Sequence, residues 1–90
     1  MALQIINAPG SDARETADRI QNAIALAIPG AEIEVTCGSG GHFEIRVVSE
    51  AFEGKNRVAQ HQLVYGAITD LMTGDSPPVH AIDRLDCSLP

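Results

Sequence analysis

The sequence predicts a two-layer α+β domain in which two helices cover one face of a three-stranded sheet. Apolar residues recur at helical spacing in two long segments, and three shorter segments alternate between polar and apolar residues as half-buried strands do. The expected order is helix–strand–strand–helix–strand, and a helical turn at Glu50–Phe52 would extend it to α-β-β-α-α-β. At 90 residues, the chain is expected to be a single domain.

The first helix is expected to begin at Ser11 or Asp12, since either residue can cap a helix N-terminus, and to stop before Pro29. Residues 1–10 come before it and are interpreted as a flexible N-terminal arm. The apolar positions of the helix have the three- and four-residue spacing of a helix packed on one side, at Ala17, Ile20, Ala23 or Ile24, and Ala27 or Ile28.

The next two strands are expected to pair as a hairpin with a glycine-rich connection. Residues 32–36 alternate between polar and apolar, and residues 43–47 do the same with their apolar side chains on one face. Residues 37–41 contain too much glycine to form a regular element. The hairpin therefore has a long, pliable tip, with Cys37 at one end and His42 at the other.

A second long helix is expected between Asn56, which can cap it, and the breaker segment 74–78. A third strand is expected to start at Val79. In a strand, His80 points to the side opposite Val79. If Val79 packs against the helices, the His80 side chain lies on the open face of the sheet or at its end. The stripe predicted for the helix is Val58, His61 or Gln62, Tyr65, Ile68, and Leu71 or Met72.

Charge and apolar content argue against several functions. Six Lys and Arg residues against twelve Asp and Glu residues give a net charge of −6, which disfavours nucleic acid binding because that binding depends on phosphate neutralisation. A weak basic patch of Arg46, Lys55 and Arg57 is the local exception. No apolar run approaches the roughly 20 residues that span a bilayer, and no signal sequence is recognisable, so no membrane association is expected and the cytoplasm is the expected compartment.

Histidine and cysteine side chains are the candidates for chemistry, because imidazole and thiolate groups bind zinc, copper and iron–sulfur clusters. Cys37, His42 and His80 are the candidate metal ligands. His61 is a secondary candidate for a metal or partner contact, since its helical spacing is equally typical of a partly buried residue, and Cys87 is left without a role. Two or three ligands are fewer than the four of a closed zinc site, so a second protein or a small thiol would complete the site. The alternative is that these residues bind no metal. The serines lack the features of a hydrolase nucleophile, and the chain is not expected to be an enzyme.

Five short motifs resemble the BolA family, and its IbaG-like branch in particular. They follow one another in the order that the predicted elements require. The resemblance covers about Asp12 to Asp86, and the domain is placed at residues 11–86, which leaves residues 1–10 and 87–90 as flanking segments. Ser39 stands where cysteine-type members tend to carry a loop cysteine, and glutamines replace arginines that many members have in the second helix. The motifs are His42-Phe43, Val47-Val48-Ser49, Phe52-Glu53-Gly54-Lys55, Gln60-His61-Gln62-Leu63-Val64-Tyr65 and Val79-His80-Ala81-Ile82.

The resemblance implies a fold similar to a type II KH domain and a partnership with monothiol glutaredoxins that carry a Cys-Gly-Phe-Ser motif. Such pairs share a 2Fe–2S cluster, held by the glutaredoxin cysteine, by glutathione and by the BolA-like protein, in iron–sulfur cluster trafficking and iron homeostasis. The C-terminal histidine ligand of the family corresponds to His80. The second ligand comes from the loop between the first two strands, where Cys37 and His42 are the candidates. No cluster is expected in the isolated chain.

Two other functions remain open at this stage. Parts of the BolA family are associated with a role as DNA-binding transcriptional regulators, and the KH-like fold is compatible with it. The net charge of −6 and the glutamines at Gln60 and Gln62 count against that role in this chain. The other possibility is a protein interaction module that binds no metal.

Overall fold

The computed structural model describes residues 9–90, with side chains from residue 12 onward. The first helix, α2 (Pro9–Ala27), starts earlier than the expected cap at Ser11. Proline is suited to the first position of a helix, because the amide hydrogen it lacks would have no partner there. The predicted N-terminal arm lies outside the described residues, apart from its last two residues, which belong to α2.

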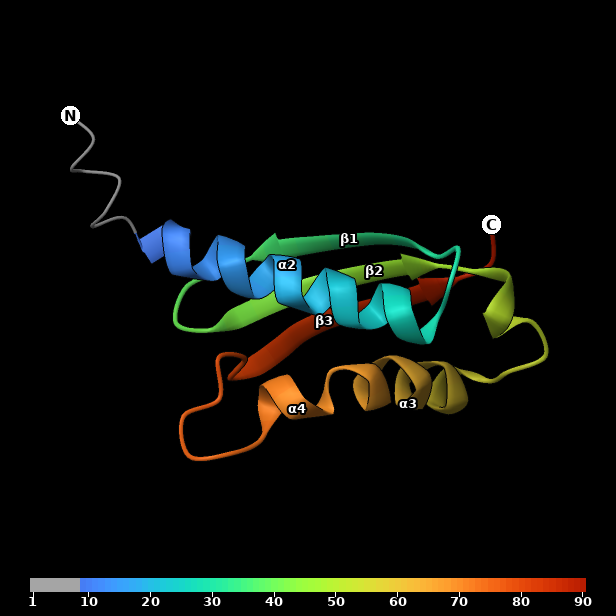
Figure 1. Cartoon of the computed structure of the whole chain (residues 1–90). Coiled ribbons are helices and arrows are strands. Elements are labelled where there is room, and N and C mark those ends of the chain that lie inside the picture. The colour runs from blue at the N-terminus through green and yellow to red at the C-terminus, as the bar shows by residue number, and fades with distance from the viewer. Residues whose placement is uncertain (1–8) are drawn as a thin grey trace.

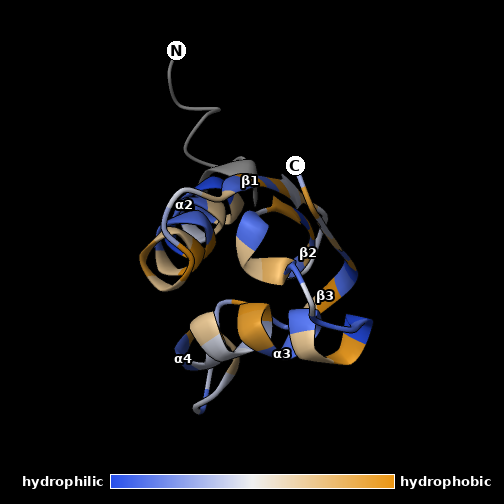
Figure 2. Cartoon of the chain, turned by 90° about the vertical axis from the view of Figure 1, so that its right-hand side faces the viewer, coloured by the Kyte–Doolittle hydropathy of each residue, from blue (hydrophilic) through white to orange (hydrophobic). Residues whose placement is uncertain are grey.

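Two strands, a short 3-10 turn, two further helices and a third strand follow α2 (Figure 1). β2 is the central strand, with β1 antiparallel on one side and β3 parallel on the other. A parallel pair needs a crossover connection, which η1, α3 and α4 supply. α2 and α3 lie on the same side of the sheet (Figure 2), which confirms the predicted two-layer α+β architecture. The bounds are β1 (Glu32–Cys37), β2 (His42–Val48), η1 (Glu50–Phe52), α3 (Arg57–Ala67), α4 (Thr69–Met72) and β3 (Ala81–Ser88).

The core lies between the sheet and the helices. The predicted stripe of α2 is buried, and in β2 every second residue is buried, as the alternation predicts. The opposite side of the sheet, here called the open face, is exposed and mostly charged. Among the described residues, no helix has the length and apolar character to cross a membrane. The core consists of Ala17, Ile20, Ile24, Ile28, Phe43, Ile45, Val47, Phe52, Val64, Ile68, Leu71, Val79 and Leu85. The open face includes Glu32, Glu34, Thr36, His42, Glu44, Arg46, Arg84 and Asp86.

The expected single long helix is divided at Ile68 into α3 and α4. The carbonyl of Tyr65 accepts two hydrogen bonds at this point, from the Ile68 amide at 3.1 Å and from the Thr69 hydroxyl at 2.9 Å. A threonine hydroxyl that bonds back to the preceding turn tends to bend a helix. The break therefore has a local cause that hydrophobic spacing does not reveal.

The start of α3 is partly as predicted. Asn56 caps the helix, and its side-chain oxygen accepts a hydrogen bond from the Ala59 amide at 2.9 Å. The predicted apolar stripe is wrong at Val58, whose side chain is 64% exposed, and the fully buried residue of α3 is Val64. The rest of the stripe is confirmed, since Ile68 and Leu71 are buried and Tyr65 is partly buried.

The third strand starts later than expected, at Ala81 rather than Val79. Val79 is buried, and its amide donates to the carbonyl of Leu71 in α4 at 3.1 Å, so this residue belongs to the connection. β3 then extends to Ser88, where Cys87 and Ser88 pair with the end of β2. The first two residues of the flanking segment 87–90 are therefore part of the sheet.

Candidate functional site

The predicted ligand residues lie at the end of the sheet where β1 ends and β2 and β3 begin. Cys37 is the last residue of β1, His42 is the first residue of β2, and His80 directly precedes β3. The glycine loop (residues 38–41) joins β1 to β2. The Gly38 amide donates to the His42 carbonyl at 2.7 Å, so the loop is closed tightly at its base.

Gly41 ties His80 to the glycine loop. Its carbonyl accepts hydrogen bonds from the amides of His80, at 2.9 Å, and Ala81, at 3.2 Å. Gly41 has a φ of +80°, and a Cβ atom built at this position would come within 3.0–3.2 Å of three side-chain carbons of His80. Glycine is therefore required here twice, for the backbone conformation and for the space that His80 occupies.

The second imidazole lies against the adjacent glycine. The nearest atom to a Cβ built at Gly40 is Cδ2 of His42, at 3.9 Å. Since Gly40 and Gly41 are neighbours, His42 and His80 flank the same two-residue turn. Both histidines are exposed to solvent. The structure thus places two of the three predicted metal ligands on either side of this turn.

Asp83 contacts His42 and was not predicted from the sequence as a site residue. Its Oδ1 atom lies 2.9 Å from Nδ1 of His42. The side chains of His42 and Asp83 are 46% and 52% exposed, so the pair is at the surface. The contact therefore connects the first residue of β2 to β3 through the Nδ1 atom of His42.

Cys37 lies apart from His42 although the two residues are close in sequence. Cys37 pairs with Phe43 across the hairpin, and paired residues of antiparallel strands project to the same face. Phe43 points into the core, and the Cys37 thiol accordingly donates to the carbonyl of Ala13 in α2 at 3.5 Å. His42 precedes Phe43 and projects to the open face. The two candidate loop ligands therefore point to opposite sides of the sheet.

His61 and Cys87 lie together near the other end of β3. Both line a small cavity at the start of α3, of about 150 Å³. Ala81 pairs with His42, and Cys87 is six residues further along the strand, which at 3.3 Å per residue is roughly 20 Å. The ring of His61 packs edge-on against the ring of Tyr65, and the centroids of the two rings are 6.5 Å apart. His61 is thus a half-buried helix residue outside the histidine pair.

The environment of Cys87 disfavours its thiolate. Burial, and after it the negative charge of Asp86, raises the pKa of the Cys87 thiol from 9.0 to about 11. A metal ligand or a nucleophile needs the thiolate form, so Cys87 is a poor candidate for either role at neutral pH.

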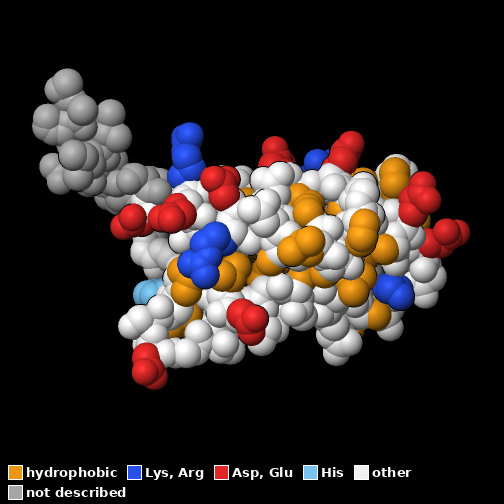
Figure 3. Space-filling model, viewed as in Figure 1, with side chains coloured by type: hydrophobic (Ala, Val, Ile, Leu, Met, Phe, Trp, Pro, Cys, Tyr) orange, Lys and Arg blue, Asp and Glu red, His pale blue; other side chains and the backbone are white. Residues whose placement is uncertain are grey.

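The three residues of the predicted basic patch, Arg46, Lys55 and Arg57, come from two parts of the fold. Arg46 lies on the open face, in a depression that Glu34 and Glu44 also line. Lys55 and Arg57 lie at the start of α3, in the helix layer. On the side shown in Figure 3, the basic side chains stand apart from one another among acidic ones.

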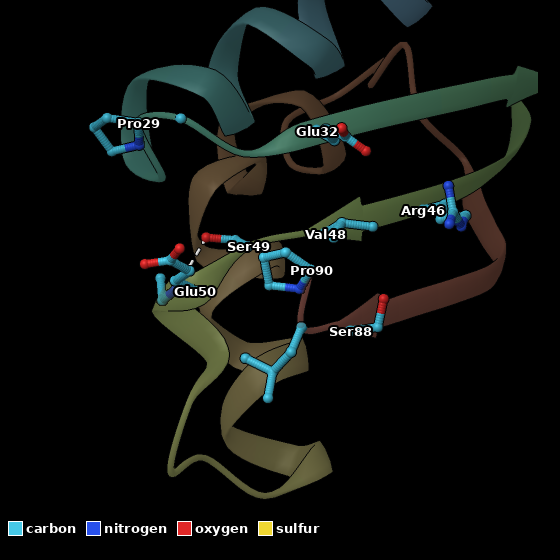
Figure 4. Close-up of a pocket in the computed structure, with 11 residues that line it drawn as sticks. Pro29, Glu32, Arg46, Val48, Ser49, Glu50, Ser88 and Pro90 are labelled. Atoms are coloured by element: carbon cyan, nitrogen blue, oxygen red, sulfur yellow. Dashed lines mark hydrogen bonds between the residues drawn. The ribbon is translucent and has the colours of Figure 1, made fainter.

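A large concave feature lies at the end of the sheet away from the histidines (Figure 4). It has a volume of about 680 Å³, and Arg46, Ser49 and Pro90 are among the residues that line it. The described residues in its wall include neither histidine nor cysteine. Imidazole groups are able to bind metals, so we take the end of the sheet that carries His42 and His80 as the candidate site.

The histidine pair is an incomplete ligand set. Among the described residues, no group of three or more His, Cys, Asp or Glu side chains is arranged to hold a metal ion. Two exposed imidazoles can supply two ligands to a cluster or ion whose other ligands come from elsewhere. The two histidines are therefore too few to complete a metal site by themselves.

Family membership follows from comparison with known proteins. A profile of the BolA-like protein family matches residues 18–85. The chain therefore belongs to the BolA-like protein family. It is 32% identical over 65 residues to the acid stress protein IbaG of Escherichia coli, covering 72% of this chain and 74% of that protein. It is 34% identical over 65 residues to a protein of the rpoN-murA intergenic region of Acinetobacter guillouiae, covering 72% and 75%.

Solved structures show the same fold. The BolA domain of SufE1 from Arabidopsis thaliana is 31% identical, with a TM-score of 0.69 and coverage of 83% of this chain and 92% of that one. The BolA1 protein of Mus musculus is 29% identical, with a TM-score of 0.67 and coverage of 82% and 64%. The family resemblance and the fold predicted from the sequence are thus confirmed.

Two residues of the site escaped sequence reasoning. Asp83 had no recognisable signal, because its contact with His42 depends on how β3 pairs with β2. In the sequence, Gly41 is one of several glycines of the loop, and its bonds to His80 and Ala81 depend on the folded arrangement. The separation of Cys37 from His42 did have a signal, since Cys37 continues the alternation of Ile33 and Val35 toward the core.

Proposed function

We propose that this protein is a non-catalytic adaptor that shares a 2Fe–2S cluster with a monothiol glutaredoxin and glutathione, in iron–sulfur cluster trafficking or iron homeostasis. The observation that carries the proposal is the histidine pair at the glycine loop. His42 and His80 are exposed, they flank one turn, and they are too few to close a metal site alone. Membership of the BolA-like family supports the same role.

We assign the two ligands to His80 and His42 rather than to His80 and Cys37. The His42 ring lies against the residue next to Gly41, which holds His80. The Cys37 thiol is directed toward α2 and already donates a hydrogen bond there. Cys37 pairs with Phe43, so its side chain projects to the helix side of the sheet, away from His42.

A cluster held in this way would have properties suited to transfer. Histidine ligands raise the reduction potential of a 2Fe–2S cluster relative to an all-cysteine set. Imidazoles must be unprotonated to bind, so the cluster is held less well as the pH falls. Both ligands are exposed, which leaves the cluster accessible to a receiving protein.

The test is reconstitution of the chain with a monothiol glutaredoxin, glutathione, iron and sulfide, followed by visible absorption and circular dichroism. We expect His80→Ala and His42→Ala to lose the spectrum of the mixed complex, while Cys37→Ser keeps it. The Cys37→Ser variant is a matched control, because it changes a neighbouring polar group without touching either imidazole.

Two outcomes would contradict this proposal at different points. A spectrum that His80→Ala leaves unchanged would exclude the cluster role for this site. A spectrum that survives His42→Ala but is lost in Cys37→Ser would keep the function and show that Cys37 is the loop ligand.

A further inference from the structure

A β-bulge places Asp83 beside His42. His42 pairs with Ala81 and Phe43 pairs with Ile82, but the next pair is Glu44 with Arg84, so Asp83 has no partner in the ladder. A residue that a bulge releases from pairing can be directed to a new position. The Asp83 carboxylate is directed to Nδ1 of His42, at 2.9 Å.

This contact fixes where the proton sits on the His42 ring. An ionised carboxylate can only accept hydrogen bonds, so Nδ1 must carry the hydrogen. In the neutral imidazole, the lone pair that can bind a metal then belongs to Nε2. Asp83 therefore selects the tautomer in which Nε2 is the free ligand atom of His42.

The contact is poorly suited to a purely structural role. Both side chains are about half exposed, at 46% and 52%, and exposed ion pairs contribute little to folding stability. The cost of ordering both side chains is offset only weakly, so positioning the ring is the better account of why the two lie together.

We propose that Asp83 is a positioning residue that orients His42 and presents its Nε2 atom to the shared cluster. The inference rests on the proposed function and adds Asp83 to the residues that serve it. Carboxylates that hold the second nitrogen of a metal-binding histidine fix the orientation of the ring and raise its basicity, and their loss costs about 10- to 100-fold in metal affinity or activity.

The first test uses the isolated chain and needs no cluster. Long-range ¹H–¹⁵N NMR spectra of the ¹⁵N-labelled protein, recorded under mildly alkaline conditions, report which ring nitrogen of His42 carries the hydrogen. We expect the hydrogen on Nδ1 in the wild type and in Asp86→Ala, and a mixture of tautomers or the hydrogen on Nε2 in Asp83→Ala. A wild-type ring with its hydrogen on Nε2 would overturn the inference.

Asp86→Ala is the matched control. Asp86 lies on the same strand, its side chain is also 52% exposed, and its contact is with Arg84 at 3.0 Å rather than with a histidine. The variant removes one negative charge from β3, as Asp83→Ala does, and leaves His42 untouched. Asp83→Glu keeps the carboxylate and is expected to restore the wild-type tautomer in part.

The second test uses the reconstituted complex with glutaredoxin and glutathione. We expect Asp83→Ala to lose its cluster to an iron chelator about 10-fold faster or more, while Asp86→Ala behaves as the wild type. If both variants match the wild type, the proposed function stands and the role of Asp83 is refuted. If the wild type itself forms no complex, the proposed function fails, and the NMR result then describes only a structural contact, which also overturns this inference.

Discussion

Cys87 and Cys37 are both free thiols in this chain, but their surroundings differ. Cys37 is exposed at the end of β1, whereas Cys87 is partly covered at the outer strand of the sheet, where it packs against the core and beside Asp86. Burial and the Asp86 charge both disfavour the Cys87 thiolate, in that order, so its pKa rises from 9.0 to about 11. The folding stability of the protein is therefore expected to depend on pH through Cys87.

The sign of the link follows from the two protonation equilibria. The unfolded chain releases the Cys87 proton near pH 9.0, while the folded chain keeps it until about pH 11. We therefore expect the contribution of Cys87 to folding stability to be complete below pH 9.0 and to be lost as the pH rises toward 11. Urea unfolding of the wild type and of Cys87→Ala over this pH range measures this contribution. The gap between the two stabilities should change with pH, and a constant gap would contradict the assignment.

At the scale of elements, the glycine loop is the part of the fold that makes the site. It connects β1 to β2 through residues with positive φ, and it provides the carbonyl to which the start of β3 is bonded. The hydrogen bonds of one residue, Gly41, thus determine where His80 lies relative to His42. These contacts tie the loop to the start of β3.

Gly41→Ala and Gly30→Ala separate backbone strain from the displacement of His80. The two glycines have similar φ values, +80° and +84°, but a Cβ at Gly30 meets nothing within 4 Å, whereas one at Gly41 meets His80. We expect both variants to lose about 1–2 kcal/mol of stability through the left-handed backbone. Only Gly41→Ala should also shift the His80 NMR signals and weaken the cluster complex. Equal effects of both variants on the cluster would show that Gly41 does not hold the imidazole.

At the scale of the whole molecule, charge decides between the proposed adaptor and a DNA-binding regulator. The net charge is −6, and the residues of the predicted basic patch come from two parts of the fold, Arg46 from β2 and Lys55 and Arg57 from the start of α3. We expect no saturable binding to duplex DNA at moderate salt, and no difference between the wild type and a Lys55→Gln, Arg57→Gln double variant, in a fluorescence anisotropy titration. Binding with a steep salt dependence that the double variant removes would favour the regulator instead.

Local patterns account for most of the fold and for the identity of the paired histidines. The spacing of Ile20, Ile24 and Ile28 and the alternation around Phe43 predicted α2 and the hairpin, because these elements follow from side-chain periodicity alone. The break at Ile68 and the late start of β3 could not be predicted, since both depend on hydrogen bonds between specific turns.

The arrangement of the site was less predictable than its composition. The position of Asp83 depends on a register shift between parallel strands that have α3 and α4 between them in the sequence. Such a shift is decided by how Ile82 and Leu85 both reach the core, which is a property of the packed molecule. Residue types therefore indicated a metal site, and only the pairing of β2 with β3 showed how its parts are held.

The bonds from Gly41 to His80 and Ala81 also bear on when the protein becomes competent during its synthesis. His42 is made early, but its partner imidazole and Asp83 arrive only with the last strand, after the whole crossover has been translated. Parallel pairing over such a separation forms late, because the loop must close before the contacts stabilise it. A nascent chain that lacks the last strand can thus offer only one imidazole of the histidine pair. Under the proposed function, only molecules with a complete sheet would hold the cluster. Fraying of β3, which is an outer strand, would release the cluster.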